Sequence, residues 1–483
     1  MALNSFVIAI DIGTTSTKAL AVTATGKVLA QHQVFYSTAY SRPGYAEQNA
    51  NEILAAVISA LNTIETQLDL SKAVALTFSS AMHSVVAVNE KCEALTPLMI
   101  WADTRSSAQA KKLRHSELGI ELHRRSGTPI HPMSPLCKLM WLQINEPEMH
   151  SRAYKFISIK EFVWYHLTGE FSIDYSIASA TGLFDIHDQV WNKSALQLAG
   201  ITAQQLSDPV SVTHQSKLKA GKDLSRYQQI PLIIGASDGC LAQLGSDAMQ
   251  PGVLTVTLGT SGAVRRSATR TLADPHSRLF NYILTDYETV AGGATNNGTA
   301  VMDWFIKEFS NAEKLPAMVA RVCKEIPAGS DGLLALPFLQ GERAPIYNPE
   351  ARGVFFNISM QHTQQHFGRA LLEAICYELK WITESVEAVC GSSDKVVVSG
   401  GITHFPEWVQ MLADVFNREV IVSSDHDASA MGAARLAFQK LQLPFAFTTE
   451  VQTTFTPNSN NAQVYAAGYT HFRALYQALE KLF

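Results

Sequence analysis

One short pattern occurs twice in this chain, about half a chain length apart. An apolar run stops at a polar turn that contains Gly-Thr and then resumes, first in AIDIGTTSTKAL (9–20) and again in GVLTVTLGTSGAVRR (252–266). Apolar runs on both sides of such a turn predict two β-hairpins. The turn glycines, Gly13 and Gly259, are separated by about half of the 483 residues. The repeat therefore predicts two duplicated domains that face each other across a cleft.

The tips of both predicted hairpins carry groups that suit phosphate binding. Backbone N–H groups and hydroxyls gather at residues 13–16 and again at residues 259–261, and such a tip can cradle phosphate oxygens. Asp11 ends the first strand, where its carboxylate is placed to hold Mg²⁺ directly or through water. An ordinary polar hairpin is the alternative for each stretch, and the repetition favours phosphate binding.

The composition limits the class of protein. Hydrophobic residues make up 47% of the chain and charged residues 17%, with a formal net charge of -5. These values are typical of a soluble globular protein and give no indication of a nucleic-acid partner or a polybasic membrane surface. The six cysteines form no C-x-x-C pair, so we expect neither a zinc site nor a disulfide framework, and a reduced, cytoplasmic location. The first residues predict neither a signal peptide nor a membrane-spanning helix.

Strand and helix patterns alternate along the chain, which predicts an α/β architecture. A helix is predicted over 51–66, a second hairpin around Thr25-Gly26, and a strand–turn–strand unit over 72–90. Because the hairpin pattern recurs after residue 246, we place the domain boundary there. The expected domains are residues 1–245 and 246–483.

Asp238 lies in the stretch PLIIGASDGCLAQLG (231–245), where a strand pattern runs into small residues and then a helix pattern. An aspartate between small residues at the end of a strand lets a substrate come close, so Asp238 is a candidate general base for an attacking hydroxyl. The alternative is a helix N-cap, a position that favours Asp. The two interpretations are compatible.

Two stretches in the second half are rich in small residues. In KVVVSGGITHFPEWVQMLADVF (395–416), Gly400 and Gly401 separate a strand from an amphipathic helix. The pair allows a ribose or a flat ring to lie against the backbone, or it is simply a strand–helix turn. In ASAMGAARLAF (428–438), the small residues allow either close helix packing or room for an adenine.

The order of these motifs resembles that of the ASKHA ATPases, the group of actin, Hsp70 and the sugar kinases. MSPLCKLMWL (133–142) and GVFFNISMQHTQQHFGRALLE (353–373) are similar to the two signatures of the FGGY carbohydrate kinases, with Asn357 where the family usually has Gly. The resemblance covers nearly the whole chain. It implies an α/β fold of two duplicated ribonuclease H-like ATPase domains around a central cleft.

The resemblance also implies phosphoryl transfer from ATP with Mg²⁺, with Asp238 as the general base. It implies that the nucleotide is bound by Asp11, Gly13, Thr14, Thr15, Ser16 and Lys18 in the first domain, and by Gly259, Thr260, Ser261, Gly400, Gly401 and Ile402 in the second. Asp11 and Asp238 would hold the metal ion. The sugar would be bordered by Asp238 together with Met82, His83, Trp101, Asp103, Arg105 and Lys138.

Three stretches, 126–139, 174–186 and 341–353, are similar to family members that phosphorylate D-gluconate. Xylulose, ribulose, fuculose and glycerol are the alternative acceptors, and an actin- or Hsp70-like nucleotide-binding protein is the rival outside the kinases. Gluconate is an anion, so its site needs hydrogen-bond donors or a cation. The oligomeric state stays open, a homodimer included.

Three of the candidate residues keep a second interpretation. His83 also fits a core histidine that is hydrogen-bonded to the backbone, and Lys138 also fits a surface residue on a helix. Arg343, in GERAPIYNPEARG (341–353), either reaches the expected cleft or braces its own loop.

Overall fold

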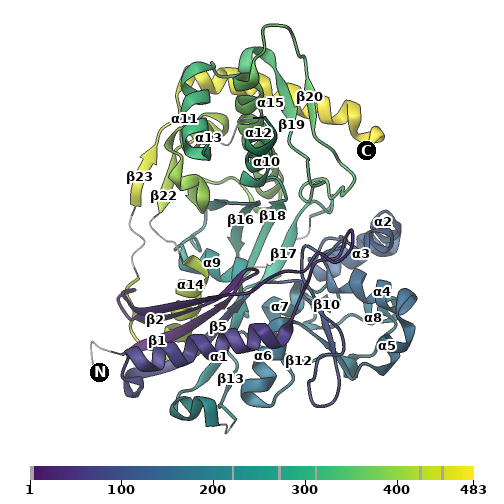
Figure 1. Ribbon diagram of the computed structural model, residues 1–483, viewed down its shortest axis with the longest axis vertical. Helices are drawn as coiled ribbons and strands as arrows, with labels where there is room; N and C mark the ends of the chain where they lie inside the picture. The colour runs from purple at the N-terminus through teal and green to yellow at the C-terminus, as the bar shows by residue number, and fades with distance from the viewer. Residues whose placement is uncertain (1–4, 220–221, 270–273, 310–312, 424–426, 448–450) are drawn as a thin grey trace. The chain divides into compact units, whose positions relative to one another are not determined.

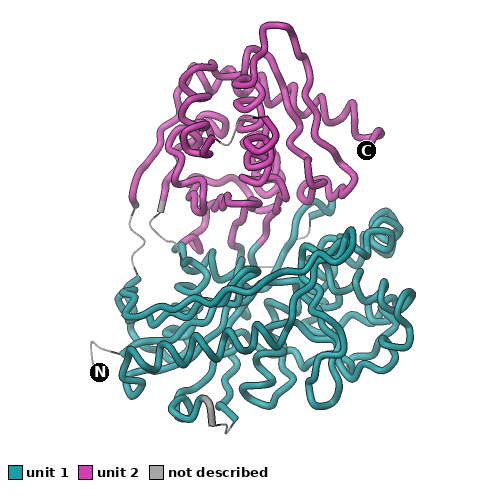
Figure 2. Tube along the Cα trace, viewed as in Figure 1, with its two compact units in different colours: residues 1–247, 268–290, 427–448 teal, residues 248–267, 291–426, 449–483 magenta. Residues whose placement is uncertain are grey.

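The computed structural model describes residues 5–219, 222–269, 274–309, 313–423, 427–447 and 451–483. The chain forms two compact units (Figure 2), and the first ends its longest segment at Asp247, near the boundary expected at 246. Two later segments, 268–290 and 427–448, belong to the first unit although they were expected in the second domain. The second unit consists of residues 248–267, 291–426 and 449–483.

The first unit is built on a sheet with the strand order β13-β14-β5-β1-β2-β3. The bounds of its strands are β1 (Phe6–Ile12), β2 (Ser16–Thr23), β3 (Val28–Phe35), β5 (Ala73–Ser80), β13 (Gln215–Ser216) and β14 (Leu232–Ser237). Strands β1, β2 and β3 form the expected antiparallel meander, whereas β1, β5 and β14 run parallel to one another. Gly26 has a φ of 80° at the β2–β3 turn, which a glycine adopts without strain.

Both faces of this sheet are covered, which explains the nearly continuous apolar sequence of β1. Ile8 and Ile10 pack in one core cluster with α1 (Ala50–Gln67), which extends the helix expected over 51–66 (Figure 1). Successive side chains of a strand point to opposite faces. Val7 and Ala9, which are fully buried as well, therefore face the other side, and we assign α14 (Ala428–Lys440), which contacts β1, β5 and β14, to that side.

Helix α14 packs against α9 (Asp238–Gly245) at unusually close range, because small residues line the contact. A Cβ atom added to Gly432 would lie 1.9 Å from the carbonyl oxygen of Leu241, and one added to Gly245 would lie 1.9 Å from that of Ala428. Of the two interpretations of the 428–438 stretch, the structure therefore shows helix packing. This contact also explains why residues 427–448 join the first unit.

The remainder of the first unit is mainly helical, with short strand pairs. Its helices are α2 (Ser107–Arg114), α3 (Glu117–Ser126), α4 (Pro135–Asn145), α5 (Pro147–Arg152), α6 (Ile159–Thr168), α7 (Tyr175–Ser179) and α8 (Lys193–Ala199). The paired strands are β4 (Glu47–Gln48) with β7 (Leu98–Met99), β6 (Val86–Val88) with β8 (Lys155–Ile157), β9 (Ser172–Asp174) with β12 (Asp208–Val210), and β10 (Phe184–Asp185) with β11 (Val190–Trp191). Strand β17 (Phe280–Ile283) also lies in this unit. The second strand of the 72–90 stretch, β6, pairs with β8 rather than with β5.

The second unit repeats an arrangement of the first unit, in which the first strand of an antiparallel hairpin also has a parallel neighbour. Strands β18 (Thr289–Thr295), β16 (Gly262–Ala268), β15 (Val253–Leu258), β21 (Lys395–Ser399), β22 (Val420–Ser423) and β23 (Val451–Phe455) follow one another in its sheet. Strands β15 and β16 are antiparallel and β15 and β21 are parallel. The helices are α10 (Thr299–Phe309), α11 (Leu315–Glu325), α12 (Gln364–Cys390), α13 (Pro406–Phe416) and α15 (Ser459–Leu479), and β19 (Leu334–Leu336) pairs with β20 (Val354–Phe356).

Asn357 directly follows β20 and takes the backbone conformation that a glycine would favour. Its φ is 65°, a left-handed value that asparagine tolerates better than most residues. Its Nδ2 donates a hydrogen bond of 3.0 Å to the carbonyl oxygen of Gly332. The departure from the usual glycine is therefore accommodated locally. Within the described part of the chain, none of the helices combines the length and the apolar character that a membrane span requires.

Candidate functional site

The candidate residues of the first unit gather at one edge of its sheet. Strands β14, β5 and β1 are parallel neighbours, and the register pairs Ile12 with Ser80 and Ser80 with Ser237. The carboxyl ends of all three strands therefore lie at the same edge, which is where open α/β sheets bind their ligands. The residues at these three ends include Asp11 and Asp238. The sheet thus brings both candidate metal ligands to one edge.

Asp11 is a half-buried carboxylate with one oxygen engaged. Its Oδ1 accepts a hydrogen bond of 2.7 Å from Oγ of Ser79, while Oδ2 accepts none from the described residues. Burial raises the pKa of Asp11, and the hydrogen bond from Ser79 and the charge of Lys18 lower it. Lys18 itself forms an ion pair with Asp427. An open carboxylate oxygen is the kind of donor that Mg²⁺ prefers, so Asp11 fits the metal role.

The first hairpin tip is held in shape by the residues around it. The N–H of Gly13 donates to the carbonyl oxygen of Ser16 at 3.0 Å, and the hydroxyl of Tyr36 donates to the carbonyl oxygen of Gly13 at 2.6 Å. Nε2 of Gln48 donates to the carbonyl oxygen of Thr14 at 2.6 Å. Thr15 is exposed at the tip. The carbonyls of the tip are thus bound from the protein side, which leaves a rigid turn suited to a phosphate group.

Asp238 is the first residue of α9, one position after the N-cap, which is Ser237. Its Oδ1 accepts a hydrogen bond of 2.6 Å from the N–H of Gly239. The fully buried Lys160 lies close enough for the charge of Asp238 to raise its pKa, although burial is the larger effect and lowers it. Nζ of Lys160 donates to Oδ2 of Asp174 at 2.9 Å. The negative charges of Asp174 and Asp238 both favour the ammonium form of Lys160.

Met82 and His83 follow β5, and His83 has an unusual backbone conformation. Its φ is 68°, a left-handed value that costs energy for a non-glycine residue and is often found at functional sites. Nδ1 lies 2.7 Å from the carbonyl oxygen of Ala180, so this nitrogen carries the proton. Nε2 lies 3.4 Å from the hydroxyl of Tyr282, which donates to it. The imidazole is thus hydrogen-bonded to the backbone, as the core interpretation expected, and the backbone of His83 is strained.

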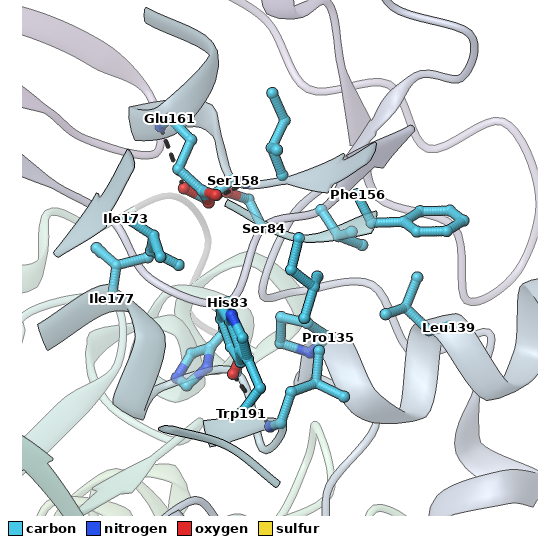
Figure 3. A pocket seen from close by; sticks show the side chains of 15 residues that line it. His83, Ser84, Pro135, Leu139, Phe156, Ser158, Glu161, Ile173, Ile177 and Trp191 are labelled. Atoms are coloured by element: carbon cyan, nitrogen blue, oxygen red, sulfur yellow. Dashed lines mark hydrogen bonds between the residues drawn. The ribbon is translucent and has the colours of Figure 1, made fainter. Parts of the chain in front are cut away.

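A small cavity lies beside His83, and all of its lining residues belong to the first unit (Figure 3). Its volume is about 20 Å³, which suits roughly one water molecule and is too small for a sugar. Ser84, Ser158 and Glu161 are among its lining residues. Burial raises the pKa of Glu161 to about 7. The cavity is therefore not a candidate sugar site.

The charged side chains of the segment 101–105 are paired within the protein. Asp103, which is fully buried, forms an ion pair with Arg105 at an N–O distance of 2.7 Å. Arg105 also pairs with Glu47 at 2.5 Å. The guanidinium carbon of Arg105 lies 3.7 Å from the ring centroid of Tyr45. Both side chains are thus occupied by the protein. Trp101 instead reaches the first hairpin, where its Nε1 donates to Oγ1 of Thr14 at 2.9 Å.

Lys138 is fully buried on α4, so the interpretation as a surface residue is wrong. Its ammonium group donates to the backbone carbonyl oxygens of His83 and Ile100, each at 2.7 Å. Sequence patterns gave no indication of this burial, because a lysine in the first turns of a helix usually faces solvent.

In the second unit, three segments converge on the tip of the β15–β16 hairpin. The N–H of Thr299, at the start of α10, donates to the carbonyl oxygen of Gly259 at 2.7 Å, and the N–H of Gly298 donates to that of Thr260 at 3.2 Å. Gly400 has a φ of 87°, and a Cβ atom there would lie 2.8 Å from the carbonyl oxygen of Leu258. The Gly-Gly turn thus needs Gly400 to approach the hairpin.

The rest of this convergence involves Gly401 and Ile402. A Cβ atom on Gly401 would lie 3.8 Å from Cα of Gly259, so the two predicted nucleotide loops are in contact within this unit. The side chain of Ile402 is fully buried. The residue as a whole has no exposed surface in the structure, whereas we expected it to line the adenosine.

Sequence reasoning missed a buried carboxylate network beside this convergence. Both oxygens of the fully buried Glu342 are hydrogen-bonded, with Oε2 accepting from Oγ1 of Thr295 at 2.6 Å and from Nδ2 of Asn297 at 2.7 Å. The guanidinium of Arg343 donates to the carbonyl oxygen of Thr295 at 2.9 Å, so it braces the loop. The only signal for Glu342 in the sequence was its position as an acidic residue just after a mainly apolar stretch.

Two family models match this chain. The N-terminal domain of the FGGY family of carbohydrate kinases matches residues 6–245, and the C-terminal domain of the same family matches residues 254–441. A gluconokinase of Bacillus subtilis (strain 168) is 37% identical, over 99% of this chain and 97% of that protein.

Two crystal structures are similar over nearly their full lengths. The gluconate kinase of Lactobacillus acidophilus has a TM-score of 0.92 and 28% sequence identity, covering 98% of both chains. The ligand-bound xylulose kinase of the same organism also has a TM-score of 0.92 and 28% identity, covering 99% of this chain and 98% of that one. The expected α/β fold class of two-domain sugar kinases is confirmed.

Proposed function

This chain belongs to the FGGY family of carbohydrate kinases, and from that premise we propose that it transfers the terminal phosphoryl group of ATP to D-gluconate. The products are 6-phosphogluconate and ADP. The observation that carries the choice of acceptor is the 37% identity to a gluconokinase along almost the entire chain. Fold likeness does not separate acceptors, because the gluconate kinase and the xylulose kinase have the same TM-score.

The proposed general base is Asp238. Its place at the first turn of α9, at the carboxyl edge of the sheet, supports this role. The buried Lys160 lies nearby, where the charge of Asp238 raises the pKa of its ammonium group. In the proposed step, a carboxylate oxygen of Asp238 accepts the proton of the attacking primary hydroxyl while the bond to the phosphorus forms. Phosphoryl transfer requires little more from a protein than positioning and charge stabilisation.

The proposed phosphate contacts are the two hairpin tips, residues 13–16 and 259–261, with Gly400 and Gly401 against the adenosine. The rigid bonding of each tip supports this assignment. Asp11 and Asp238 would hold Mg²⁺, which when bound neutralises charge on the phosphate oxygens. The open Oδ2 of Asp11 supports the assignment of the metal. Lys18 is paired with Asp427, so we propose that its charge acts on Asp11 rather than on a phosphate directly.

On the sugar side we propose Met82, His83 and Trp101 as contacts. The cations of the neighbouring segments are already occupied: Arg105 is paired with two carboxylates and Lys138 with backbone carbonyls. We therefore propose that neutral donors and His83, rather than Arg105 or Lys138, meet the sugar acid.

The test is a panel of acceptors, measured side by side with purified protein: D-gluconate, xylulose, ribulose, fuculose and glycerol. The proposal expects the highest kcat/KM for gluconate. A higher value for xylulose would make the protein a xylulose kinase, the alternative that the equal TM-score keeps open. ADP release at the same rate without any acceptor would instead indicate an actin- or Hsp70-like ATPase.

The variant His83→Ala tests the sugar side separately. We expect the KM for the sugar to rise about tenfold or more, because a buried polar contact is lost, while the KM for ATP changes little. An unchanged KM for the sugar would return His83 to a purely structural role. His32→Ala, a change in strand β3, is the matched control.

Location and assembly complete the proposal. None of the six cysteines forms a disulfide in the structure, which supports a reducing, cytoplasmic location. We also propose that the protein acts without a nucleic-acid partner and assembles as a homodimer. Light scattering on the purified protein tests the assembly, and a monomer mass would remove the homodimer from the proposal.

A further inference from the structure

The ammonium group of Lys138 connects two segments that are distant in sequence. Lys138 is fully buried. Its Nζ donates to the carbonyl oxygens of His83 and Ile100 at 2.7 Å each, and to that of Met99 at 3.4 Å. An ammonium group has three donors, so three carbonyls use its full capacity. All three donors of the ammonium group thus bind backbone carbonyls of the protein.

Both connected segments carry proposed sugar contacts. The first acceptor is the carbonyl of His83 itself, and the second, Ile100, directly precedes Trp101. His83 also has the left-handed φ of 68°, which the surroundings must maintain. Burying an ammonium group is costly unless it is well bonded. A neutral side chain would fill this space at lower cost, so the charge has a task that packing alone does not require.

We propose that Lys138 is a positioning residue, a buried cross-link that fixes His83 and Trp101 in the geometry that binds the sugar, and not a ligand of the sugar's carboxylate. The inference rests on the proposed function, because it assumes that the two segments border the acceptor.

The cross-link is sensitive to pH. Burial lowers the pKa of Lys138 to about 7, the charge of Asp103 raises it, and that of Arg105 lowers it. The neighbouring Cys137 stays neutral in this range, because burial raises its pKa to about 11. Loss of the proton leaves an amine with two N–H donors for three carbonyls. As the pH rises through about 7, the cross-link therefore loses one of its hydrogen bonds.

The first test is Lys138→Met, which keeps an unbranched side chain, one heavy atom shorter, and removes its donors. Kinetics use whichever acceptor of the panel the wild-type protein turns over best, and a second acceptor that is neutral. We expect the KM for both acceptors to rise by the same factor, roughly tenfold or more, with the KM for ATP within about twofold of the wild-type value. A loss confined to gluconate would overturn the inference, since it would show a direct contact with the carboxylate.

The matched control is Lys193→Met, which replaces an exposed lysine at the start of α8 and should change neither KM. Hydrogen exchange gives a readout that depends on no acceptor, so it remains decisive if the proposed function fails. In Lys138→Met we expect faster exchange of the amides in 82–85 and 99–102, with the sheet strands unchanged. Unchanged exchange in both segments would overturn the inference.

The wild-type protein provides a second test if Lys138→Met does not fold. Exchange in 82–85 and 99–102, corrected for the intrinsic dependence on pH, should rise above a midpoint near the pKa of about 7. The KM for the acceptor should rise over the same range while that for ATP stays flat. A flat exchange profile from pH 6 to 9, a range of about one to two units around that pKa, would contradict the proposal.

Discussion

Nε1 of Trp101 donates a hydrogen bond of 2.9 Å to Oγ1 of Thr14. Trp101 lies in the segment proposed to border the sugar, and Thr14 lies at the tip of the first hairpin, which we assign to the phosphates. Both residues belong to the first unit. The bond therefore links the two halves of the proposed reaction within one unit.

This link predicts non-additive kinetics. Trp101→Phe and Thr14→Val each remove one side of the bond, and each should lower kcat/KM. The double variant should be little worse than the poorer single variant, with a coupling energy of about 1 kcal/mol. Steady-state kinetics of the four proteins measure the coupling. Additive losses would show that the two residues act independently.

Asp238→Asn removes the proposed base and keeps the shape of the side chain. We expect kcat to fall by about 10²–10⁴-fold, the usual contribution of a positioned base, with ATP binding retained in calorimetry. Asp188→Asn is the control, because that carboxylate pairs with Arg125 at the surface. A variant with near-normal kcat would remove Asp238 from the proposed mechanism.

The sheet and its hairpins could be predicted from sequence because their signals are local. The apolar run of β1, the turn at Gly13 and the repeat at Gly259 each occupy a few adjacent residues, and the structure places them as strands and turns. The carboxyl edge that holds Asp11 and Asp238 follows from the parallel order of β1, β5 and β14.

The partners of the charged residues could not be predicted in this way. The sequence shows the residue types of Arg105 and Lys138, but a pairing with Glu47 or with the carbonyl of Ile100 depends on contacts between distant segments. For the same reason the small residues around Gly432 left packing and adenine binding as two alternatives. The contact with α9 decides for packing.

Gly432→Ala tests that close contact. The added Cβ atom would lie 1.9 Å from the carbonyl oxygen of Leu241, so α14 and α9 must separate. Overpacking of this kind costs about 1–3 kcal/mol, and we expect a clear drop in the melting temperature. A melting temperature equal to that of the wild-type protein would show that the two helices adjust freely.

Gly259→Ala is the contrasting case. A Cβ atom at this position meets nothing within 4 Å, so the fold should tolerate it, and the melting temperature should not change. The methyl group would however occupy the tip that we assign to the phosphates. We expect a raised KM for ATP with the KM for the sugar unchanged. An unchanged KM for ATP would count against phosphate binding at this hairpin.

Glu378, in the middle of α12, is fully buried, and neither of its carboxyl oxygens has a hydrogen-bond partner among the described residues. Burial raises its pKa well above the usual value, and the negative charge of Glu342 raises it further, while Arg473 lowers it. In the unfolded chain this carboxyl loses its proton near pH 4.5. In the folded protein it keeps the proton to higher pH.

Between those two pKa values the folded state binds more protons than the unfolded state, so the stability should fall as the pH rises above about 4.5. Each pH unit within that window lowers the free energy of unfolding by up to about 1.4 kcal/mol.

Glu378→Gln cannot titrate and should lose this part of the slope of stability against pH. We expect the variant to gain melting temperature over the wild-type protein at pH 8, and to gain much less at pH 5. Calorimetric scans from pH 5 to 8, with the change at Glu480 near the C-terminus (Glu480→Gln) as the control, measure the difference. Equal slopes in wild type and Glu378→Gln would show that Glu378 is already ionised in the folded protein.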